Sequence, residues 1–408
     1  MKKSILRNYA RLIATMGAKV QKGQDVIITA ALDQPEFVTM VAEECYRLGA
    51  RHVRVDWSHQ PLAKLTQKKC SVTTLSKVED WEKARWEHYC DTLPVRIYLE
   101  SDDPDGLKGV NQAKISKASQ ARYKVIKPYR ERMENRYQWC IAAVPGPAWA
   151  KKVFPGLSRR QAMEKLWEAI LYTSRATEDP IAAWEEHNRD LAARCAYLNG
   201  LGIKTLEYRS ANGTDFSVGM IEDALFLGGS EIAQGSGIEY NPNIPSEEVF
   251  ISPMKGIAEG VVYSSKPLSY RGELIENFSM RFEGGKVVEV HAEKNEALLK
   301  EMVSMDEGAA YLGECALVPY DSPIRNSGIL FYNTLFDENA ACHLALGHGF
   351  TNVIKDYDKY TVKECYEKGI NDSMIHLDFM IGTEDLSIVA VTRDGKRVQI
   401  FENGNWAF

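Results

Sequence analysis

The residue types best suited to chemistry gather in the last third of the chain. An apolar run at residues 329–336 is predicted to form a buried strand that ends at an acidic turn. His343 is predicted to lie on the first turns of the helix that follows, and the spacing of His376 and Asp378 places both on one face of a strand. Imidazoles and carboxylates gathered by an apolar framework suit a divalent metal ion with nitrogen and oxygen ligands.

Two further predicted strands begin with acidic side chains. The pair Glu247 and Glu248 opens one strand, and Glu314 stands at the start of another. The chain thus offers five candidate metal ligands, which are Glu248, Glu314, His343, His376 and Asp378. Five such groups exceed the ligand set of one tetrahedral ion with an open position, and they match two ions bridged by a carboxylate.

The ordinary alternative is that each of these side chains is a satisfied polar group or a cap, which is the commoner role for a single His or Asp at a strand end. Two features favour a metal. Four of the eight histidines lie in the last third of the chain, namely His291, His343, His348 and His376. In addition, His343 and His376 lie in apolar sequence, where a buried polar group without a partner costs roughly 1–3 kcal/mol.

The composition is that of an ordinary soluble globular protein. Its 408 residues are 45% hydrophobic and 26% charged, which allows two or three domains with a large core. The net charge of −6 argues against a nucleic-acid partner, and no apolar stretch is long enough for a membrane span. The basic N-terminal segment lacks the apolar core of a signal peptide, so an amphipathic first helix is predicted.

The eight cysteines are scattered and form no CxxC pair, which argues against a thiolate zinc site. We expect reduced thiols in a cytoplasmic protein. Cys342 is next to His343 in sequence, but this does not bring the two side chains together, so a catalytic cysteine–histidine pair is not predicted.

The order of the predicted elements favours two domains. Residues 1–60 read as helix, strand, helix and strand, a βαβ unit with parallel strands and no nucleotide-binding glycine motif. Residues 158–199 are strongly helical, with Ser158 as a predicted cap. Short alternating strands follow. We predict an α/β domain at residues 1–200 and an α+β domain at 201–408, with the boundary between 200 and 245.

Glycine-bearing segments in the second half of the chain indicate turns. Residues 228–237 are predicted to be a hairpin loop or a lid, since no helix follows that would cradle a phosphate. A short strand is predicted just before them, at residues 224–227. The chain ends in predicted hairpins with turns at Asp394–Gly395 and Asn403–Gly404.

Four motifs resemble those of one protein family. They are Ile-Pro-Ser-Glu-Glu-Val-Phe at 244–250, Gly-Glu-Cys-Ala-Leu-Val at 313–318, Leu-Phe-Asp-Glu-Asn-Ala-Ala-Cys-His-Leu-Ala-Leu-Gly at 335–347 and His-Leu-Asp-Phe-Met-Ile-Gly at 376–382. The chain resembles the thermophilic aminopeptidases, the aminopeptidase T, S and II group known as peptidase family M29. The likeness runs nearly from end to end.

The resemblance implies a cytoplasmic metallo-aminopeptidase with two divalent ions. It also implies an N-terminal α/β domain, a C-terminal α+β catalytic domain, and a homodimer whose active sites face an internal cavity. The family's metal ligands fall on the five residues gathered above, which are Glu248, Glu314, His343, His376 and Asp378.

One position departs from the family pattern. The family usually has a tyrosine seven residues after the ligand histidine, and this chain has Phe350 there. A tyrosine role in metal ligation or in transition-state stabilisation is therefore in doubt. His348 is a candidate to compensate, as are Tyr357 and Tyr360, for which no spacing argument exists.

We predict hydrolysis of the N-terminal peptide bond of peptides with a free N-terminus, by water that two ions activate. A carboxylate must move a proton to the leaving amine. Glu247, Asp337 and Glu338 are the candidates, and each is equally explicable as a group that orients a ligand histidine. The ligand set admits Zn, Co or Mn, and the sequence does not identify the preferred N-terminal residue. Two alternatives stay open, a small-molecule amidohydrolase with the same dinuclear site and a non-catalytic peptide-binding scaffold.

Overall fold

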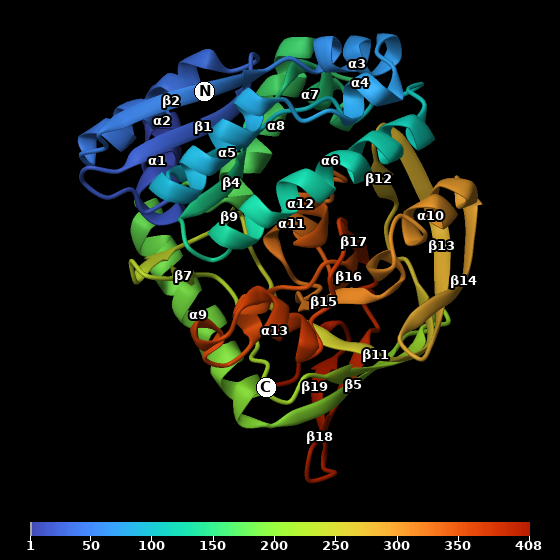
Figure 1. Cartoon of the computed structure of the whole chain (residues 1–408). Coiled ribbons are helices and arrows are strands. Elements are labelled where there is room, and N and C mark those ends of the chain that lie inside the picture. The colour runs from blue at the N-terminus through green and yellow to red at the C-terminus, as the bar shows by residue number, and fades with distance from the viewer. Residues whose placement is uncertain (1) are drawn as a thin grey trace. The chain divides into compact units, whose positions relative to one another are not determined.

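The computed structural model describes residues 2–408, which form two compact units (Figure 1). The first unit contains the chain up to His187 and the segment Ser230–Pro245, and the second contains Asn188–Gly229 and Ser246–Phe408. The sequence placed one boundary between residues 200 and 245, whereas the chain changes unit three times. The reason is that a short strand near residue 244 pairs within the first unit. All eight candidate site residues lie in the second unit.

The first unit is built on a parallel sheet with the strand order β2-β1-β3-β4-β9. The strands are β1 (Asp25–Ala31), β2 (His52–Ser58), β3 (Val95–Glu100), β4 (Trp139–Ala143) and β9 (Asn243–Ile244). The inner strands read as nearly continuous apolar runs, because helices cover a parallel sheet on both faces. The predicted α/β architecture of the N-terminal half is confirmed.

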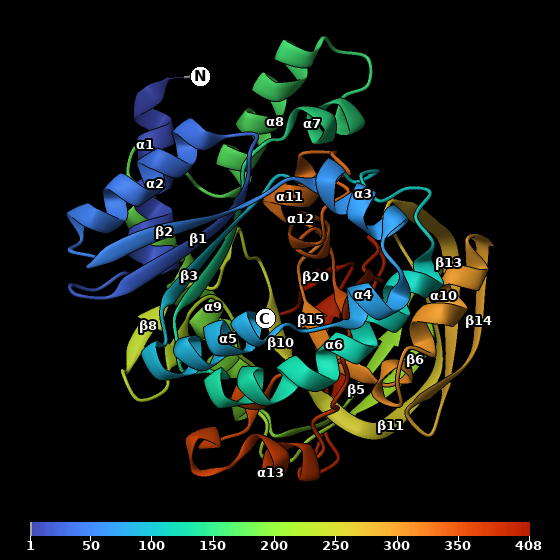
Figure 2. The ribbon, with the colours of Figure 1, turned by 45° about the horizontal axis from the view of Figure 1, so that its top comes forward.

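The helices of this unit follow the strands in alternation. They are α1 (Lys3–Leu12), the π-helical turn η1 (Ile13–Gly17), α2 (Pro35–Arg47), α3 (Gln60–Lys69), α4 (Val72–Ser76), α5 (Asp80–Thr92), α6 (Gln112–Met133), α7 (Pro147–Val153), α8 (Arg159–Thr173) and the start of α9 (Pro180–Gly200), which belongs to the second unit from Asn188 onward. Figure 2 shows α1 beside α2 and α7 beside α8. A hairpin of β7 (Glu231–Ala233) and β8 (Ile238–Tyr240) forms where residues 228–237 were predicted to turn.

The helical stretch predicted at residues 158–199 is two helices. Ser158 caps α8 as expected, and it forms a capping box with Gln161. The chain then leaves the helix after Thr173, and Pro180 is the first residue of α9. Proline is well suited to that position, because its ring fixes φ and it has no N–H group to satisfy.

The second unit contains two antiparallel sheets. The larger has the order β12-β13-β11-β6-β5-β18-β19-β20, with β14 on β13. Its strands are β5 (Ile203–Arg209), β6 (Asp215–Met220), β11 (Pro253–Tyr263), β12 (Leu268–Tyr270), β13 (Glu273–Glu283), β14 (Lys286–Lys294), β18 (Ser387–Thr392), β19 (Arg397–Glu402) and β20 (Asn405–Trp406). The smaller sheet consists of β10 (Val249–Ile251), β15 (Leu312–Leu317), β16 (His343–Gly347) and β17 (His376–Met380), in that order.

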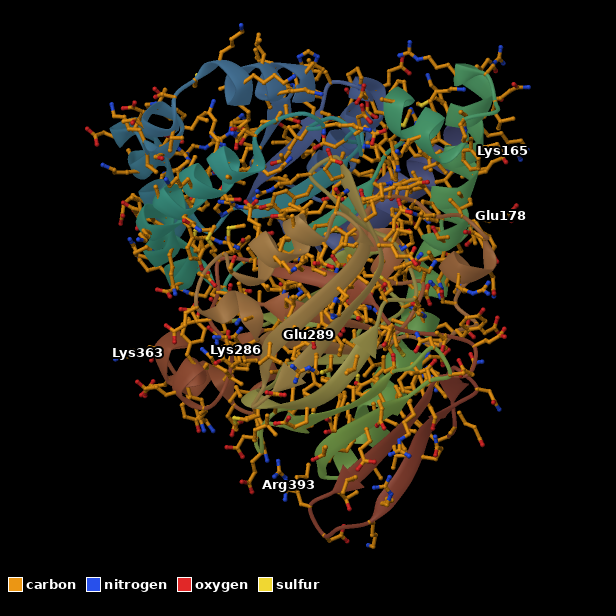
Figure 3. The ribbon with its side chains drawn as sticks, turned by 90° about the vertical axis from the view of Figure 1, so that its right-hand side faces the viewer. Lys165, Glu178, Lys286, Glu289, Lys363 and Arg393 are labelled. Atoms are coloured by element: carbon orange, nitrogen blue, oxygen red, sulfur yellow. The ribbon has the colours of Figure 1, made fainter. Side chains whose placement is uncertain are left out.

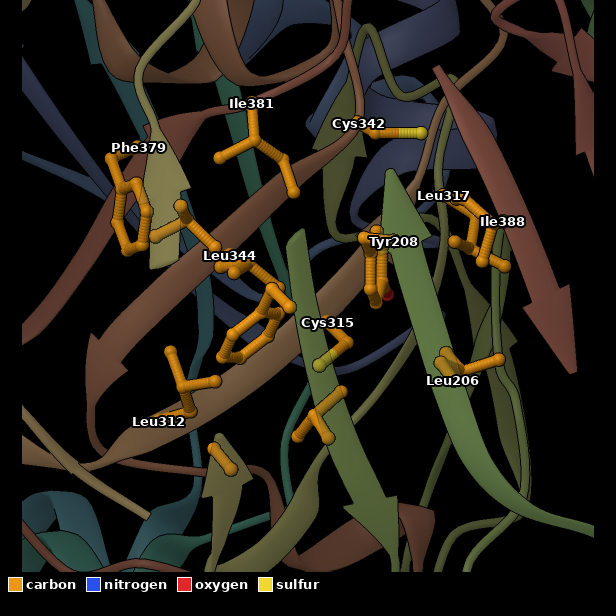
Figure 4. Close-up of a cluster of buried hydrophobic side chains, with 14 of the residues drawn as sticks. Leu206, Tyr208, Leu312, Cys315, Leu317, Cys342, Leu344, Phe379, Ile381 and Ile388 are labelled. Carbon is orange, nitrogen blue, oxygen red and sulfur yellow. The ribbon is translucent and has the colours of Figure 1, made fainter. Parts of the chain in front are cut away.

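A single large apolar core joins the two sheets (Figure 4). Tyr208 and Ile388 enter it from the larger sheet, and Cys315, Leu344 and Phe379 enter it from the smaller one. All of these side chains are fully or almost fully buried. One face of the smaller sheet is therefore covered by apolar packing, and its other face is available for polar side chains.

Short helices complete the second unit. They are α10 (Glu296–Val303), α11 (Pro323–Asn326), α12 (Thr334–Glu338) and α13 (Val362–Glu367), with the 3₁₀ turns η2 (Gly308–Ala310), η3 (Thr351–Val353) and η4 (Tyr357–Lys359). Figure 3 shows charged side chains such as Lys286, Glu289, Lys363 and Arg393, which are exposed. No helix within residues 2–408 is long and apolar enough to cross a bilayer. The eight cysteines are free thiols, as predicted.

The predicted hairpin turns at the end of the chain are confirmed. Asn403 and Gly404 both have positive φ, at 50° and 70°, as a two-residue turn between antiparallel strands requires. Residues 224–227, predicted as a strand, instead form only two isolated bridges, from Ala224 and Leu227.

The strand predicted at residues 329–336 is wrong. Tyr332 has a left-handed backbone with φ of 55°, which interrupts an extended chain. The Asp337 carboxylate accepts hydrogen bonds from the N–H groups of Phe331 at 2.9 Å and Asn333 at 3.1 Å. These bonds satisfy the backbone of the loop before α12, so Phe331 is buried without joining a sheet.

Candidate metal centre

The face of the smaller sheet that is turned away from the core carries the candidate ligands. Along β17, Leu377 and Phe379 belong to the apolar core, whereas His376 and Asp378 alternate with them. Successive side chains of a strand point to opposite faces, so this strand has an apolar row of side chains on one face of the sheet and a polar row on the other. The predicted placement of His376 and Asp378 on one face of a strand is confirmed.

His343 is the first residue of β16, and the helix predicted for it is wrong. Cys342, Leu344 and Leu346 belong to the apolar core, so His343 points to the opposite face. Alanine and leucine have high helix propensity, and the segment contains both. Pairing with β15 on one side and β17 on the other outweighs that local preference.

Small residues stand opposite the candidate ligands in the ladder. Ala345 is paired with Glu314 on one side and with Asp378 on the other. Ala316 is paired with His343, and Gly347 with His376. Cross-strand partners on one face have Cβ atoms only ~4.5–5.5 Å apart, so large residues here would fill the space between the polar groups. The alternation of small and functional residues makes room for the cluster.

The remaining two acids come from the other strands. A register shift between Leu312 and Glu314 puts Leu312 in the core and Glu314 on the polar face of β15. Such a bulge re-aims the side chains on either side of it. Glu248 directly precedes β10, two residues before Phe250, and therefore shares the side of the strand that faces away from the large core. Both carboxyls are buried.

The structure brings all five predicted ligands together in two groups that share one residue. Ligand-type atoms of Glu248, Glu314 and His343 lie within 4.8 Å of one another, and so do those of Glu314, His376 and Asp378. His376 Nε2 lies 3.0 Å from Glu314 Oε2 and 3.1 Å from Asp378 Oδ1. His343 Nε2 lies 3.2 Å from Glu248 Oε2. Glu314 is the residue common to both triads.

The ring orientation of both histidines fits a metal ion. His343 Nδ1 is 3.2 Å from the main-chain oxygen of Ala341, and His376 Nδ1 is 2.7 Å from that of His348. Nδ1 therefore donates its proton to the main chain, so Nε2 is the ring nitrogen that is available to a metal ion. Each Nε2 faces carboxylate oxygens, and that of His343 is buried without a hydrogen-bond partner. When the rings are neutral, these atoms are acceptors that face one another, so they need a proton or a metal ion between them, and the donor set suits a divalent ion.

Burial and mutual repulsion control the protonation of the acids. Burial raises the pKa of Glu314 to about 7, with the neighbouring carboxylates adding to the shift and His376 opposing it. Burial also raises the pKa of Glu338 well above its usual value, as do the charges of Asp378 and the other acids. Burial alone would raise the pKa of Asp378, but His376 outweighs it and lowers the pKa to about 2.

The histidines respond in the opposite sense. Burial by itself lowers the pKa of His343, but the Glu248 carboxylate and the charges of Glu314 and Asp378 outweigh burial and raise it to about 9. The pKa of His376 is likewise raised well above its usual value against the effect of burial, chiefly by Asp378. The site thus attracts positive charge strongly, which is the electrostatic requirement for binding a cation.

The three candidate proton carriers occupy different places. Glu338, at the end of α12, is half-buried and hydrogen bonded to Asp378. Asp337 is buried, and its two oxygens accept the loop N–H groups described above. Glu247 is buried beside Glu248. None of the three belongs to either triad, but the carboxyl of Glu338 contacts the candidate ligand Asp378 and is partly exposed to solvent.

Asn339 is a site residue that the sequence reasoning missed. Its Oδ1 accepts the N–H of Glu247 at 2.6 Å, and its Nδ2 donates to the main-chain oxygen of Leu335 at 2.8 Å. It thus ties the acidic segment before β10 to α12. An asparagine directly after two acids, in a segment that also holds a ligand histidine, is the signal that would have indicated it.

Phe350 packs against the metal centre without a polar group. Its ring centroid is 4.9 Å from that of His376 and 5.3 Å from that of Phe250. His348 contributes its main-chain oxygen to the His376 ring, while its own ring lies edge-on to Tyr366. Tyr360 lies beside Lys368, and neither it nor Tyr357 belongs to a triad. The ring of Phe350 therefore occupies the position at which a tyrosine was expected, and it provides no hydroxyl group.

Buried and partly buried acid and histidine side chains on one face of an antiparallel sheet, beside a carboxyl group whose pKa is raised, are features of a metal-dependent hydrolase. The chain belongs to the thermophilic metalloprotease family (M29), whose sequence model matches residues 2–406. The predicted family membership is confirmed.

Named relatives and a solved structure agree with this assignment. Aminopeptidase AmpS of Bacillus subtilis (strain 168) is 41% identical over 99% of this chain and 98% of its own length. Aminopeptidase 2 of Geobacillus stearothermophilus is 40% identical, with the same coverage. The structure of wild-type AmpT from Thermus thermophilus superposes with a TM-score of 0.89 over 100% of both chains, at 38% identity. The protein is therefore a metal-dependent aminopeptidase, a hydrolase.

A more distant likeness concerns the fold alone. A dioxygenase from Pseudomonas putida KT2440 has a TM-score of 0.53 over 99% of this chain, at 14% identity. The fold is thus not restricted to peptidases, and the function has to be argued from the residues of the site.

Proposed function

We propose that the protein releases N-terminal residues from peptides with two divalent ions. One ion would be held by Glu248, Glu314 and His343, and the other by Glu314, His376 and Asp378. The sharing of Glu314 between both triads is the observation that carries this proposal. A carboxylate has two oxygens and bridges two ions readily, whereas five separate ligands around one ion would leave no open position for substrate.

When bound, such ions lower the pKa of water and polarise the scissile carbonyl. The protein's own residues supply the remaining functions. Main-chain oxygens of Ala341 and His348 fix the rings of His343 and His376, so that both Nε2 atoms point into the cluster. Glu338 holds a proton at neutral pH because its pKa is raised, and it is half-buried rather than sealed off. We assign to it the transfer of a proton to the leaving amine.

Asp337 and Glu247 are assigned supporting roles in the same proposal. Asp337 holds the loop before α12 through two main-chain hydrogen bonds, and α12 carries Glu338. Glu247 is anchored through its N–H to Asn339, which keeps the neighbouring Glu248 in place. Both act by positioning another residue.

The substrate class, assembly and compartment follow the resemblance to the family. We propose peptides with a free N-terminus as substrates, whose amine is attracted by the excess of carboxylates at the site. We further propose a homodimer in the cytoplasm, and the free state of all eight cysteines is in keeping with a reducing compartment. The mixed nitrogen and oxygen donors admit Zn, Co or Mn.

The test is metal content measured beside activity. The protein purified and reconstituted with each ion should bind two equivalents per chain and hydrolyse aminoacyl anilides but not their N-blocked forms. Glu314→Gln should lower the metal content and reduce kcat/KM by at least roughly 10³-fold, because it removes the shared ligand. Glu367→Gln, an exposed glutamate on α13, is the matched control. Binding of one equivalent with full activity, or an unimpaired Glu314→Gln, would defeat the two-ion proposal.

A further inference from the structure

A cavity of about 550 Å³ lies at one end of the smaller sheet within the second unit. Lys266 and Arg325 line it together with Tyr320 and Ser265. The Arg325 guanidinium donates to the Tyr320 hydroxyl and stacks on the Tyr320 ring, 4.1 Å from its centroid. That contact fixes the guanidinium in place at the cavity wall.

Neither Lys266 nor Arg325 forms a close ion pair with a described residue, although the charge of Asp337 acts on Lys266 from farther away. Within residues 2–408, no carboxylate lies within 4.0 Å of either cation. Glu384 and Asp385 also line the cavity, but Glu384 is exposed and Asp385 accepts hydrogen bonds from Ser210, Thr383 and the Ala211 N–H.

Other features of the cavity favour an anion. Burial lowers the pKa of Lys266, the nearby Asp337 opposes the shift, and Arg325 adds to it. An anion between the two cations would relieve this. Ser265 contributes a buried hydroxyl that has no hydrogen-bond partner. The cavity thus provides two cationic donors and one neutral donor, which together match the lone pairs of a carboxylate.

The cavity is adjacent to the metal centre along the strands. Ala341, which lines it, comes two residues before His343, and Gly382 comes four residues after Asp378. The Ser265 N–H donates to the main-chain oxygen of Met380, the last residue of β17. At ~3.3 Å per residue, the cavity lies roughly 7–13 Å from the ligand-bearing positions.

We propose that this cavity binds the C-terminal carboxylate of short peptide substrates, with Lys266 and Arg325 as its specificity-determining residues. The inference rests on the proposed function, because it needs the peptide's N-terminus at the metal centre. An extended chain of n residues spans at most ~3.3–3.6 Å × n, so peptides of two to four residues bridge the separation. Tripeptides match the middle of this range of distances.

The experiment compares a free tripeptide with its C-terminal amide and with an aminoacyl anilide, all with the same N-terminal residue. The metal-loaded wild type should cleave the free acid with a kcat/KM at least roughly tenfold higher than the amide, mostly through KM, because charge-assisted hydrogen bonds hold the ground state and the transition state alike. Lys266→Met and Arg325→Gln should remove that preference and leave anilide hydrolysis within about twofold of wild type. Lys266→Arg should retain most of it.

Two controls separate the possible outcomes. Lys396→Met, at an exposed turn, should behave as wild type. A tripeptide amide with aspartate at its third position tests whether a side-chain carboxylate can replace the C-terminal carboxylate. If the enzyme cleaves this peptide at the same rate as the free acid, the cavity binds side-chain carboxylates and the proposal is overturned. Equal cleavage of free acid and amide by wild type would also overturn it. Because the anilide lacks a carboxylate, its hydrolysis shows independently that the catalytic centre works.

Discussion

Ala345 of β16 and Asp378 of β17 are direct partners in the antiparallel ladder. Ala345 is fully buried, and in the ladder it stands between Asp378 on one side and Glu314 on the other. The smallest side chain that is not glycine thus stands at the centre of the acidic row. The space it leaves is the space that the two triads share.

Enlarging this residue should disable the metal centre. We expect Ala345→Leu to reduce the number of bound divalent ions and to lower kcat/KM by at least roughly 100-fold, because displacing catalytic groups by about 1 Å has effects of this size. Ala345→Gly should bind metal normally. Metal analysis and circular dichroism on both variants are the measurement. A folded Ala345→Leu protein with two equivalents of metal and normal turnover is the opposing result.

Metal binding should release protons. The pKa of His343 is about 9 and that of His376 is raised well above its usual value, so both imidazoles hold a proton on Nε2 at pH 7 in the metal-free protein. A ligand nitrogen has to lose that proton, so the apparent metal affinity should rise as the pH increases from 6 towards 9. Titration calorimetry in buffers with different ionisation enthalpies counts the protons. No proton release at pH 7 would show that the raised pKa values are wrong.

Glu338→Gln should separate proton transfer from metal binding. The amide keeps the shape of the side chain but cannot carry the proton, so we expect kcat to fall by roughly 10²–10⁴-fold. Metal content and KM should stay within about twofold, because Glu338 belongs to neither triad. Steady-state kinetics with metal analysis test this. A variant with near-normal kcat would exclude Glu338 as the proton carrier.

Asp337 should make stability depend on pH. Burial raises its pKa to about 6 although two main-chain N–H groups bind it. Since this folded-state pKa lies above the unfolded value of about 3.9, ionisation opposes folding. The free energy of unfolding should therefore fall by up to roughly 3 kcal/mol as the pH rises from about 4 to 6.

Asp337→Asn removes this titration and so provides the comparison. The stability of wild type relative to Asp337→Asn should decline over the same pH range. Urea unfolding of both metal-free proteins at pH 4, 5, 6 and 7 measures it. A difference that does not change with pH would contradict the prediction. Asp337→Ala, which leaves both N–H groups without an acceptor, should be less stable by roughly 1–3 kcal/mol at every pH.

Much of the site could be predicted because alternation along a strand is a local property. His376 and Asp378 are two residues apart in apolar sequence, and an extended chain places them on one face whatever surrounds it. Glu248 and Glu314 were predicted for the same reason, from their places at the starts of apolar strands.

His343 shows where local reasoning stops. Its neighbours favour a helix by propensity, and its strand exists only because β15 and β17 pair with it from both sides. The loop at residues 329–336 is a similar case, since hydrogen bonds to the Asp337 side chain replace the ladder that its apolar residues suggested.

By itself, the sequence determined which side chains can bind a cation, the parallel and antiparallel character of the two halves, and the family. Only the tertiary structure decided that Glu314 is shared, that Ala345 leaves the space, and that Lys266 and Arg325 meet at one cavity. The physical reason is that these relationships join residues on separate strands and loops. Their distances depend on strand register and on packing between sheets, which no local pattern encodes.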